Sequence, residues 1–195
     1  MKTIGITGGV GCGKSRILEY IRENYNCKII TADDVANEIK EPGEVCYQPL
    51  IDLLGKEILG KDKRIDKKKM AAKIFADESL LLRVNDIIHP AVKDYILEYK
   101  KTEKEKGKID YLFIEAALLI ECGYNAHVDE MWYIYTKEEV RRERLKSARG
   151  YSDEKIDSIM AAQLSEEDFK KGSDKCIDNS AGFENTVKQI RKLLG

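Results

Sequence analysis

Long apolar runs, paired cysteines and histidines are all scarce in this sequence of 195 residues. The longest clean apolar run, AALLI at 116–120, is far shorter than the ~20 residues that a membrane-spanning helix needs. The two histidines and five scattered cysteines include no CxxC pair, so we expect neither a zinc site nor a disulfide framework. No apolar leader segment follows Met1. These features favour a cytoplasmic protein with reduced thiols.

An excess of charge of either sign is also missing. Lys plus Arg number 34 and Asp plus Glu number 35, which gives a net charge of -1. The chain-wide basic surface of a nucleic-acid binder is therefore not expected, although a local basic patch for a small anionic ligand is compatible with this balance. What the chain does have is 43% hydrophobic residues, which is enough to stabilise an ordered core. At this length we expect one domain with an inserted lid or subdomain.

Short β-rich segments alternate with helical segments along much of the chain. Strands are predicted at residues 3–7, 27–31, 110–114, 128–135 and 175–178. Helices are predicted from Lys14 onward, with Ile17, Leu18 and Ile21 on one face, and at residues 138–149 and 184–194. Such alternation is typical of a parallel sheet with helices on both faces. The sequence therefore predicts an α/β fold with a parallel five-stranded sheet.

Residues 47–106 interrupt the alternation because they contain no strand pattern. Their pattern predicts several helices, one of which Pro90 is expected to end or kink, and the mixed-charge run at 99–106 is expected to be a solvated helix end. An insertion between the second and third strands is a natural place for a second-substrate subdomain. The predicted organisation is a core at about 1–40, 108–136 and 172–195, a helical subdomain at about 44–106, and a lid at about 138–168.

The strongest motif is GGVGCGKS at 8–15, which matches G-x-x-x-x-G-K-[ST] between a predicted strand and a predicted helix. Glycines allow positive φ and bring N–H groups toward phosphate oxygens, and the helix N-terminus adds partial positive charge. The expected nucleotide-binding residues are Gly8, Gly9, Val10, Gly11, Cys12, Gly13, Lys14 and Ser15. Lys14 is expected to reach the β- and γ-phosphates and Ser15 to place its hydroxyl on Mg²⁺. Cys12 is expected to be a small filler rather than a redox-sensitive thiol.

The phosphate loop alone does not say what is done with the nucleotide. A regulatory GTPase would need a guanine-reading N-K-x-D sequence, which is absent, and DLLG at 52–55 falls in a helical pattern. A large ATPase motor would need a longer chain. A small-molecule kinase fits best, and it needs an acceptor-orienting carboxylate, a second-substrate site and cations that cover the phosphates.

Candidates for these parts follow from position. Asp33 and Asp34 come directly after the second predicted strand, at the edge of a parallel sheet where ligands bind, so one is a candidate to orient an acceptor and the other to cap the next helix. Four arginines crowd residues 141–149, where we expect one or two to reach phosphates and the rest to pair with neighbouring glutamates. His89 has the apolar context of a structural histidine, and residues 178–180 are typical of a turn.

The ordered set of motifs resembles the dephospho-CoA kinase family nearly end to end. The matching segments are GITGGVGCGKS at 5–15, AD at 32–33, EPG at 41–43, IDKKKMAAKIF at 65–75, IHP at 88–90, LLIE at 118–121, AAQ at 161–163 and IDNS at 177–180. Many families share the phosphate loop, whereas the ordered combination is specific.

The resemblance implies a three-part P-loop kinase that transfers the γ-phosphoryl group of ATP to the ribose 3′-hydroxyl of dephospho-CoA with Mg²⁺. ATP and dephospho-CoA would be its small-molecule partners, without nucleic acid or membrane, and the protein would be a monomer or weak homo-oligomer. The alternatives are another P-loop small-molecule or nucleoside kinase, and a nucleotide-dependent regulatory module.

The resemblance also implies roles for individual residues. Asp33 would act as base or orienter, Lys14 would neutralise developing charge, and Ser15 would ligate Mg²⁺. The other implied contacts are Thr7, Lys67 and His89 toward the acceptor, Asn179 near the adenine, and Arg144 or Arg149 over the phosphates.

The chain departs from the family pattern at several positions. Thr31 stands where the family often has Asp, and Lys67 and Ala71 stand where it often has arginines. Because Lys cannot copy the bidentate contact of Arg, we expect the grip on the acceptor to be weaker or rearranged. Ala117 replaces the family's Pro, and Arg149 is one place away from the usual lid arginine.

Overall fold

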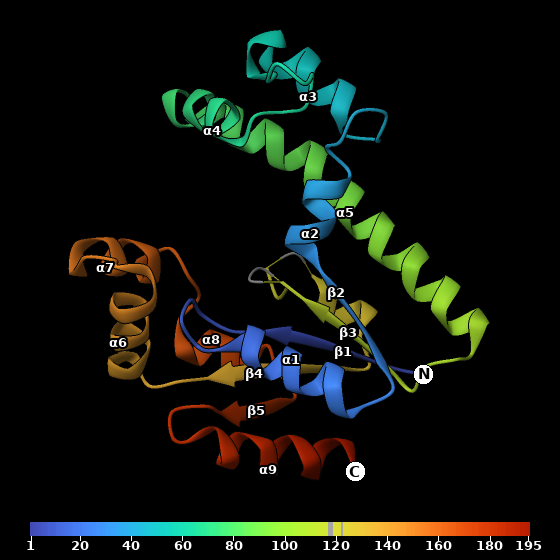
Figure 1. The fold of residues 1–195 in the computed structure, drawn as a ribbon, viewed down its shortest axis with the longest axis vertical. Helices are drawn as coiled ribbons and strands as arrows, with labels where there is room; N and C mark the ends of the chain where they lie inside the picture. The colour runs from blue at the N-terminus through green and yellow to red at the C-terminus, as the bar shows by residue number, and fades with distance from the viewer. Residues whose placement is uncertain (117–118, 122) are drawn as a thin grey trace. The chain divides into compact units, whose positions relative to one another are not determined.

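The computed structural model describes residues 1–116, 119–121 and 123–195 (Figure 1). Ala117, Leu118 and Cys122, which the sequence motifs and the cysteine count include, lie outside the described residues. The chain divides into two compact units. We call Met1–Ile29 with Gly107–Gly195 the sheet unit, and Ile30–Lys106 the helical unit.

The sheet has five strands in the order β2-β3-β1-β4-β5, and all of it except the last two residues of β2 belongs to the sheet unit. The strands are β1 (Lys2–Thr7), β2 (Cys27–Thr31), β3 (Tyr111–Glu115), β4 (Glu130–Tyr135) and β5 (Lys175–Asp178). The β1–β3, β1–β4 and β4–β5 ladders are parallel. The predicted five-stranded parallel α/β fold is therefore confirmed. The strands predicted at 27–31 and 175–178 coincide with β2 and β5. The starts of β1 and β4 differ from the prediction by one and two residues, and β3 is shifted by one residue.

Helices of the sheet unit cover both faces of this sheet (Figure 1). They are α1 (Lys14–Asn24), η2 (Tyr124–His127), α6 (Glu138–Arg149), α7 (Asp153–Ala161), α8 (Glu166–Lys171) and α9 (Phe183–Leu194). On one face, Ile17 of α1 and Ile190 of α9 pack in a single buried cluster with Trp132 of β4. Since side chains alternate along a strand, Tyr133 points to the other face, where its ring stacks on Phe169 of α8 at 5.0 Å.

The buried face of α1 was predicted correctly. Ile17, Leu18 and Ile21 are the buried residues of this helix, and their spacing places them on one side. Each such side chain contributes about 1.5–3 kcal/mol when it is fully buried. The packing therefore fixes the start of α1 against the end of β1, and with it the loop that joins them.

The helical unit contains α2 (Ala32–Glu38), α3 (Tyr47–Leu54), η1 (Lys56–Ile58), α4 (Lys67–Ala76) and α5 (Glu78–Lys106). Among the described residues, no helix in either unit has the length and apolar character that crossing a membrane requires. The long α5 contacts α2, α3 and α4, and it buries Val84, Val92 and Ile96. The other three α-helices of this unit therefore all pack against α5.

Pro90 does not end a helix, because α5 runs without interruption from Glu78 through Pro90 to Lys106. A proline inside a helix costs about 3 kcal/mol or more. The buried residues on both sides of it hold the two halves of α5 in one unit, which offsets that cost. The expectation of a purely solvated end at 99–106 is also wrong at Glu103, which is 5% exposed and pairs with Lys106 at 2.7 Å.

Candidate functional site

The glycine-rich segment forms a tight loop between β1 and α1 (Figure 1). Gly13 precedes the helix with φ 92°, a left-handed conformation that residues with a Cβ rarely adopt. A Cβ at Gly13 would lie 2.4 Å from Nδ2 of Asn179. A Cβ at Gly9 would lie 2.4 Å from the guanidinium of Arg141. Glycine at these two positions is therefore what allows other elements to approach the loop backbone closely.

Lys14 begins α1, and its ammonium lies against the loop. Its Nζ donates a hydrogen bond to the Gly8 carbonyl at 2.6 Å and lies 3.6 Å from Oε1 of Glu115. Glu115 is the last residue of β3, the strand that pairs with β1. The next residue of the loop motif, Ser15, is exposed in the first turn of α1. A hydroxyl and a carboxylate are ligands that suit Mg²⁺, so these residues fit the ion that the motif implies.

Arg141 and Gln163 clamp the backbone of Val10 within the loop. Arg141 on α6 donates from Nε to the Val10 carbonyl at 2.9 Å and from NH2 to Oε1 of Gln163 at 3.1 Å. The same oxygen of Gln163 accepts from the Val10 backbone N–H at 3.1 Å. Both polar groups of one loop residue are thus bound to side chains that follow β4.

The other three arginines of α6 make different contacts. Arg144 donates from NH2 to the Asn179 carbonyl at 2.9 Å and from NH1 to the Cys12 carbonyl at 3.5 Å. Arg142 pairs with Glu138 at 2.8 Å, which confirms the predicted pairing along the helix. Arg149 is exposed at the end of α6, with its guanidinium carbon 5.9 Å from the ring centroid of Tyr151. The structure therefore brings Arg144 to the loop and leaves Arg149 beside Tyr151.

Asn179 lies directly after β5 and is 3% exposed. Its Nδ2 donates to the carbonyl of Cys12 at 2.8 Å. The predicted turn is present here, since the Ser180 N–H donates to Oδ1 of Asp178 at 2.8 Å. Cys12 itself is 1% exposed and belongs to the core cluster, so its side chain packs as a small apolar group. Thr7, at the end of β1, is fully buried.

Apart from Thr7, the candidate acceptor residues lie in the helical unit. Asp33 is exposed in the first turn of α2. Neither it nor Asp34 caps that helix: the cap is Thr31, whose hydroxyl accepts from the Asp34 N–H at 3.2 Å, so the prediction of an aspartate cap is wrong. Lys67 is the exposed first residue of α4. His89 is exposed on α5, so the expectation of a structural histidine in apolar surroundings is wrong as well.

Lys40 is a half-buried cation in the same unit as these residues. Burial lowers the pKa of its ammonium, and the nearby positive charge of Lys67 lowers this pKa further, while Cys46 and Asp33 act in the opposite direction. Asp33, Lys40 and Lys67 therefore share one electrostatic neighbourhood within the helical unit. Lys40 and Lys67 are the two cations of this neighbourhood, and Asp33 is a carboxylate within it.

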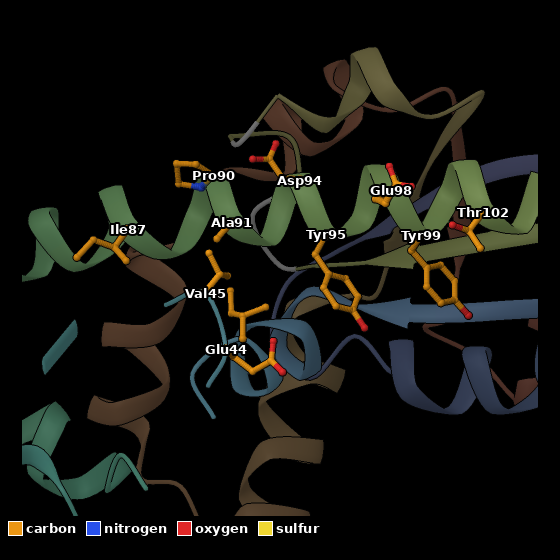
Figure 2. A pocket seen from close by; sticks show the side chains of 11 residues that line it. Glu44, Val45, Ile87, Pro90, Ala91, Asp94, Tyr95, Glu98, Tyr99 and Thr102 are labelled. Carbon is orange, nitrogen blue, oxygen red and sulfur yellow. The ribbon is translucent and has the colours of Figure 1, made fainter. Parts of the chain in front are cut away.

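A groove of about 690 Å³ runs along α5 in the helical unit (Figure 2). Tyr95 and Tyr99 of α5 point into it from one side, and Glu44 and Val45 lie opposite. The Tyr95 hydroxyl donates to the carboxylate of Glu38 at 3.1 Å. The walls are mostly apolar and the polar groups at the rim include carboxylates, so the groove does not suit a phosphate.

Comparison with known proteins decides which family this constellation represents. The model of the dephospho-CoA kinase family matches residues 2–185. The chain belongs to the dephospho-CoA kinase family. A dephospho-CoA kinase of Carboxydothermus hydrogenoformans is 37% identical over 193 residues, which covers 98% of this chain and 92% of the relative.

Solved structures agree with this membership. The dephospho-CoA kinase from Campylobacter jejuni superposes with a TM-score of 0.73 at 25% identity, covering 99% of this chain and 98% of that one. The protein TT1252 from Thermus thermophilus reaches a TM-score of 0.80 at 25% identity, covering 99% and 96%. The resemblance read from the ordered motifs is therefore confirmed, and the chain is a kinase of this family.

Several residues of this dephospho-CoA kinase family member escaped the sequence prediction. Glu115 has no role in the sequence prediction, although an acid at the carboxyl end of the strand beside β1 is a usable signal. Gln163 belonged to a matching motif without a role, and Arg141 was one of four similar arginines. Lys40 stood out in no pattern. These contacts join residues far apart in the chain, so local patterns do not reveal them.

Proposed function

We propose that the chain transfers the γ-phosphoryl group of ATP to the ribose 3′-hydroxyl of dephospho-CoA, giving coenzyme A and ADP. The observation that carries this proposal is family membership across residues 2–185 together with a formed phosphate loop. Lys14 begins the helix that follows the loop, and its ammonium lies at the loop backbone. The loop supplies the nucleotide end of the reaction, and the helical unit supplies the acceptor end.

In this proposal Lys14 stabilises the charge that develops on the transferred phosphoryl group. Its ammonium already lies between the Gly8 carbonyl and the carboxylate of Glu115, so it is a positive charge held close to the loop. When phosphate oxygens are bound, they offer this ammonium stronger, charged acceptors than a carbonyl. A positioned cation of this kind acts most strongly where charge develops in the transition state.

Ser15 and Glu115 are the residues that we propose for Mg²⁺. Ser15 would provide its hydroxyl as a ligand, and Glu115 would orient the waters of the ion from the end of β3. When bound, Mg²⁺ would supply positive charge that neutralises part of the charge of the phosphates. Glu115 also lies 3.6 Å from Lys14, so the carboxylate helps to hold the ammonium of the lysine near the phosphates.

Asp33 is the proposed base or orienter of the acceptor hydroxyl. Its carboxylate is exposed at the start of α2 and is available to accept a proton from an alcohol. Lys40 and Lys67 lie in its electrostatic neighbourhood. Dephospho-CoA carries a diphosphate, and we propose that these two cations bind it. His89 and Thr7 stay proposed acceptor contacts.

The test is acceptor-dependent release of ADP from ATP and Mg²⁺, measured with dephospho-CoA and with a panel of nucleosides and nucleotides. We expect turnover with dephospho-CoA and a product that carries a 3′-phosphate, identified by mass spectrometry and ³¹P NMR. A Lys14→Ala preparation run in parallel controls for contaminating kinases. Turnover with a different acceptor alone would contradict the proposed substrate, and ATP binding without acceptor-dependent turnover would indicate a regulatory module.

A further inference from the structure

The carbonyl oxygen of Cys12 is a second point, besides the backbone of Val10, where the sheet unit holds its phosphate loop. Three side chains reach it: Asn179 Nδ2 donates at 2.8 Å, Thr136 Oγ1 lies 3.0 Å away, and Arg144 NH1 donates at 3.5 Å. They follow β5, follow β4 and lie on α6, respectively. The one hydroxyl proton of Thr136 is shared with the Tyr135 carbonyl, which lies 2.8 Å from Oγ1. A carbonyl oxygen has two lone pairs, so this acceptor is fully used.

Binding this carbonyl fixes the direction of a neighbouring donor. The Cys12–Gly13 peptide is trans, so the Gly13 N–H points away from the Cys12 carbonyl. Once the carbonyl is bound toward Thr136 and Asn179, the N–H must face the opposite side of the loop. N–H groups at the start of a helix have no intrahelical partner, which makes this one available to a phosphate oxygen.

The carboxamide of Asn179 is itself held in place from α9. Thr186, which is fully buried, donates from its hydroxyl to Oδ1 of Asn179 at 2.9 Å. Because this oxygen accepts from Thr186, the amide nitrogen is left to face Cys12. The two ends of the carboxamide are thus both engaged inside the protein, where the side chain is 3% exposed.

We propose that Thr186 and Asn179 are positioning residues that fix the phosphate loop, and that the Asn179 carboxamide does not read the adenine base. The inference rests on the nucleotide-binding part of the proposed function and replaces the adenine contact that the family resemblance implies for Asn179. A residue that acts through the loop affects every ligand with a polyphosphate to the same extent. A residue that reads the base affects only ligands that carry the base.

The experiment measures binding of two probes, ATP and inorganic tripolyphosphate, to the wild-type protein and to Thr186→Val by calorimetry. Valine keeps the shape of threonine but removes the hydroxyl. We expect the Kd of both probes to rise about tenfold, which corresponds to about 1.4 kcal/mol. The Kd of dephospho-CoA is expected to stay within about twofold. Thr186→Ser, which restores a hydroxyl, is expected to restore both Kd values.

Each other outcome overturns the inference. Weakening of ATP alone would assign Asn179 to the base, and unchanged binding of both probes would remove Thr186 from loop positioning. Failure of Thr186→Ser to restore binding would trace the effect to packing rather than to the hydroxyl. If Thr186→Val does not fold, the pair Thr136→Val and Thr136→Ser tests the hydroxyl that lies 3.0 Å from the Cys12 carbonyl with the same readouts. These titrations measure binding and need no turnover. Their result therefore tests the inference even if dephospho-CoA proves not to be the acceptor.

Discussion

The phosphate loop of the sheet unit and the acceptor candidates of the helical unit are built in different ways. In the loop, Val10 is clamped through both backbone groups, and the Cys12 carbonyl accepts from Asn179 and Arg144. In the helical unit, Asp33, Lys67 and His89 are all exposed. A loop that binds the phosphates gains from groups already fixed in position, because no ordering is needed when the ligand arrives. The acceptor candidates of the helical unit are instead side chains exposed to solvent.

This contrast predicts that changes in the loop act on nucleotide chemistry as a whole, whereas changes in the helical unit act on the acceptor. The largest expected effect is that of Lys14→Ala. Removal of the ammonium should lower kcat for dephospho-CoA by ~10³-fold or more, because a positioned cation is lost where charge develops. ADP release at saturating substrates checks this, and a thermal unfolding curve confirms that the variant is folded. Activity within tenfold of wild type would exclude Lys14 from the reaction.

Asp33→Asn is expected to have the next largest effect. It should lower kcat by ~10²-fold or more and change the Kd of ATP by less than about threefold, because the carboxylate acts on the acceptor hydroxyl rather than on the nucleotide. Asp34→Asn is the matched control, since Asp34 is exposed in the same turn of α2. Equal losses in the two variants would show that the charge of the turn matters and not the carboxylate of Asp33.

Lys40→Gln tests the proposed contact between Lys40 and the diphosphate of the acceptor. We expect the KM for dephospho-CoA to rise about tenfold with the KM for ATP unchanged, because a hydrogen bond to a charged group contributes about 1.5–3 kcal/mol. Lys68→Gln, at an exposed position of α4, is the control. If the variant leaves the acceptor KM unchanged, the proposed diphosphate contact is wrong.

The same residue predicts a pH dependence. The pKa of Lys40 is lowered, first by burial and then by Lys67. Its ammonium therefore loses its proton at a lower pH than an ordinary lysine, and the affinity for an anionic acceptor falls with it. The KM for dephospho-CoA should rise on the alkaline side in the wild-type protein and stay flat in Lys40→Gln. A parallel rise in both proteins would assign the dependence to another group.

The smallest effect is expected at Tyr133, which belongs to the core of the sheet unit rather than to either substrate. Burial raises the pKa of its phenol, and Glu166 raises it further. A raised pKa in the folded state means that stability is fully present below the unfolded value of about 10 and is lost as the pH rises above it. Urea unfolding between about pH 9 and 11 should show a shallower loss in Tyr133→Phe than in wild type. Identical slopes would contradict this.

The outcome of the sequence predictions follows the range of the interactions. The strands, the face of α1 and the full extent of α6 were found because each depends on a local pattern. The clamp on Val10 was missed because it joins residues 131 and 153 positions apart in the chain. Thr31 appeared only as a departure from the family, and its role as the cap of α2 became visible from its hydrogen bond to Asp34.

At Pro90 the sequence predicted that a helix would end or kink, and the structure shows that the helix does not end there. Proline disfavours a helix interior, yet α5 continues through Pro90 because its residues on both sides are buried against α2, α3 and α4. The sum of many buried side chains exceeds the cost of one missing hydrogen bond. Propensity is a local term, and tertiary packing overrides it.

The sequence by itself determined the family, the phosphate loop and the order of the strands along the chain, because glycine spacing and apolar periodicity are properties of adjacent residues. The tertiary structure decided which arginines face the loop and which groups form hydrogen bonds with the carboxamide of Asn179. On α6, Arg141 and Arg144 turn toward the loop, while Arg142 pairs along the helix. Four arginines on one helix look alike in sequence, and only the packing of α6 beside the loop distinguishes them.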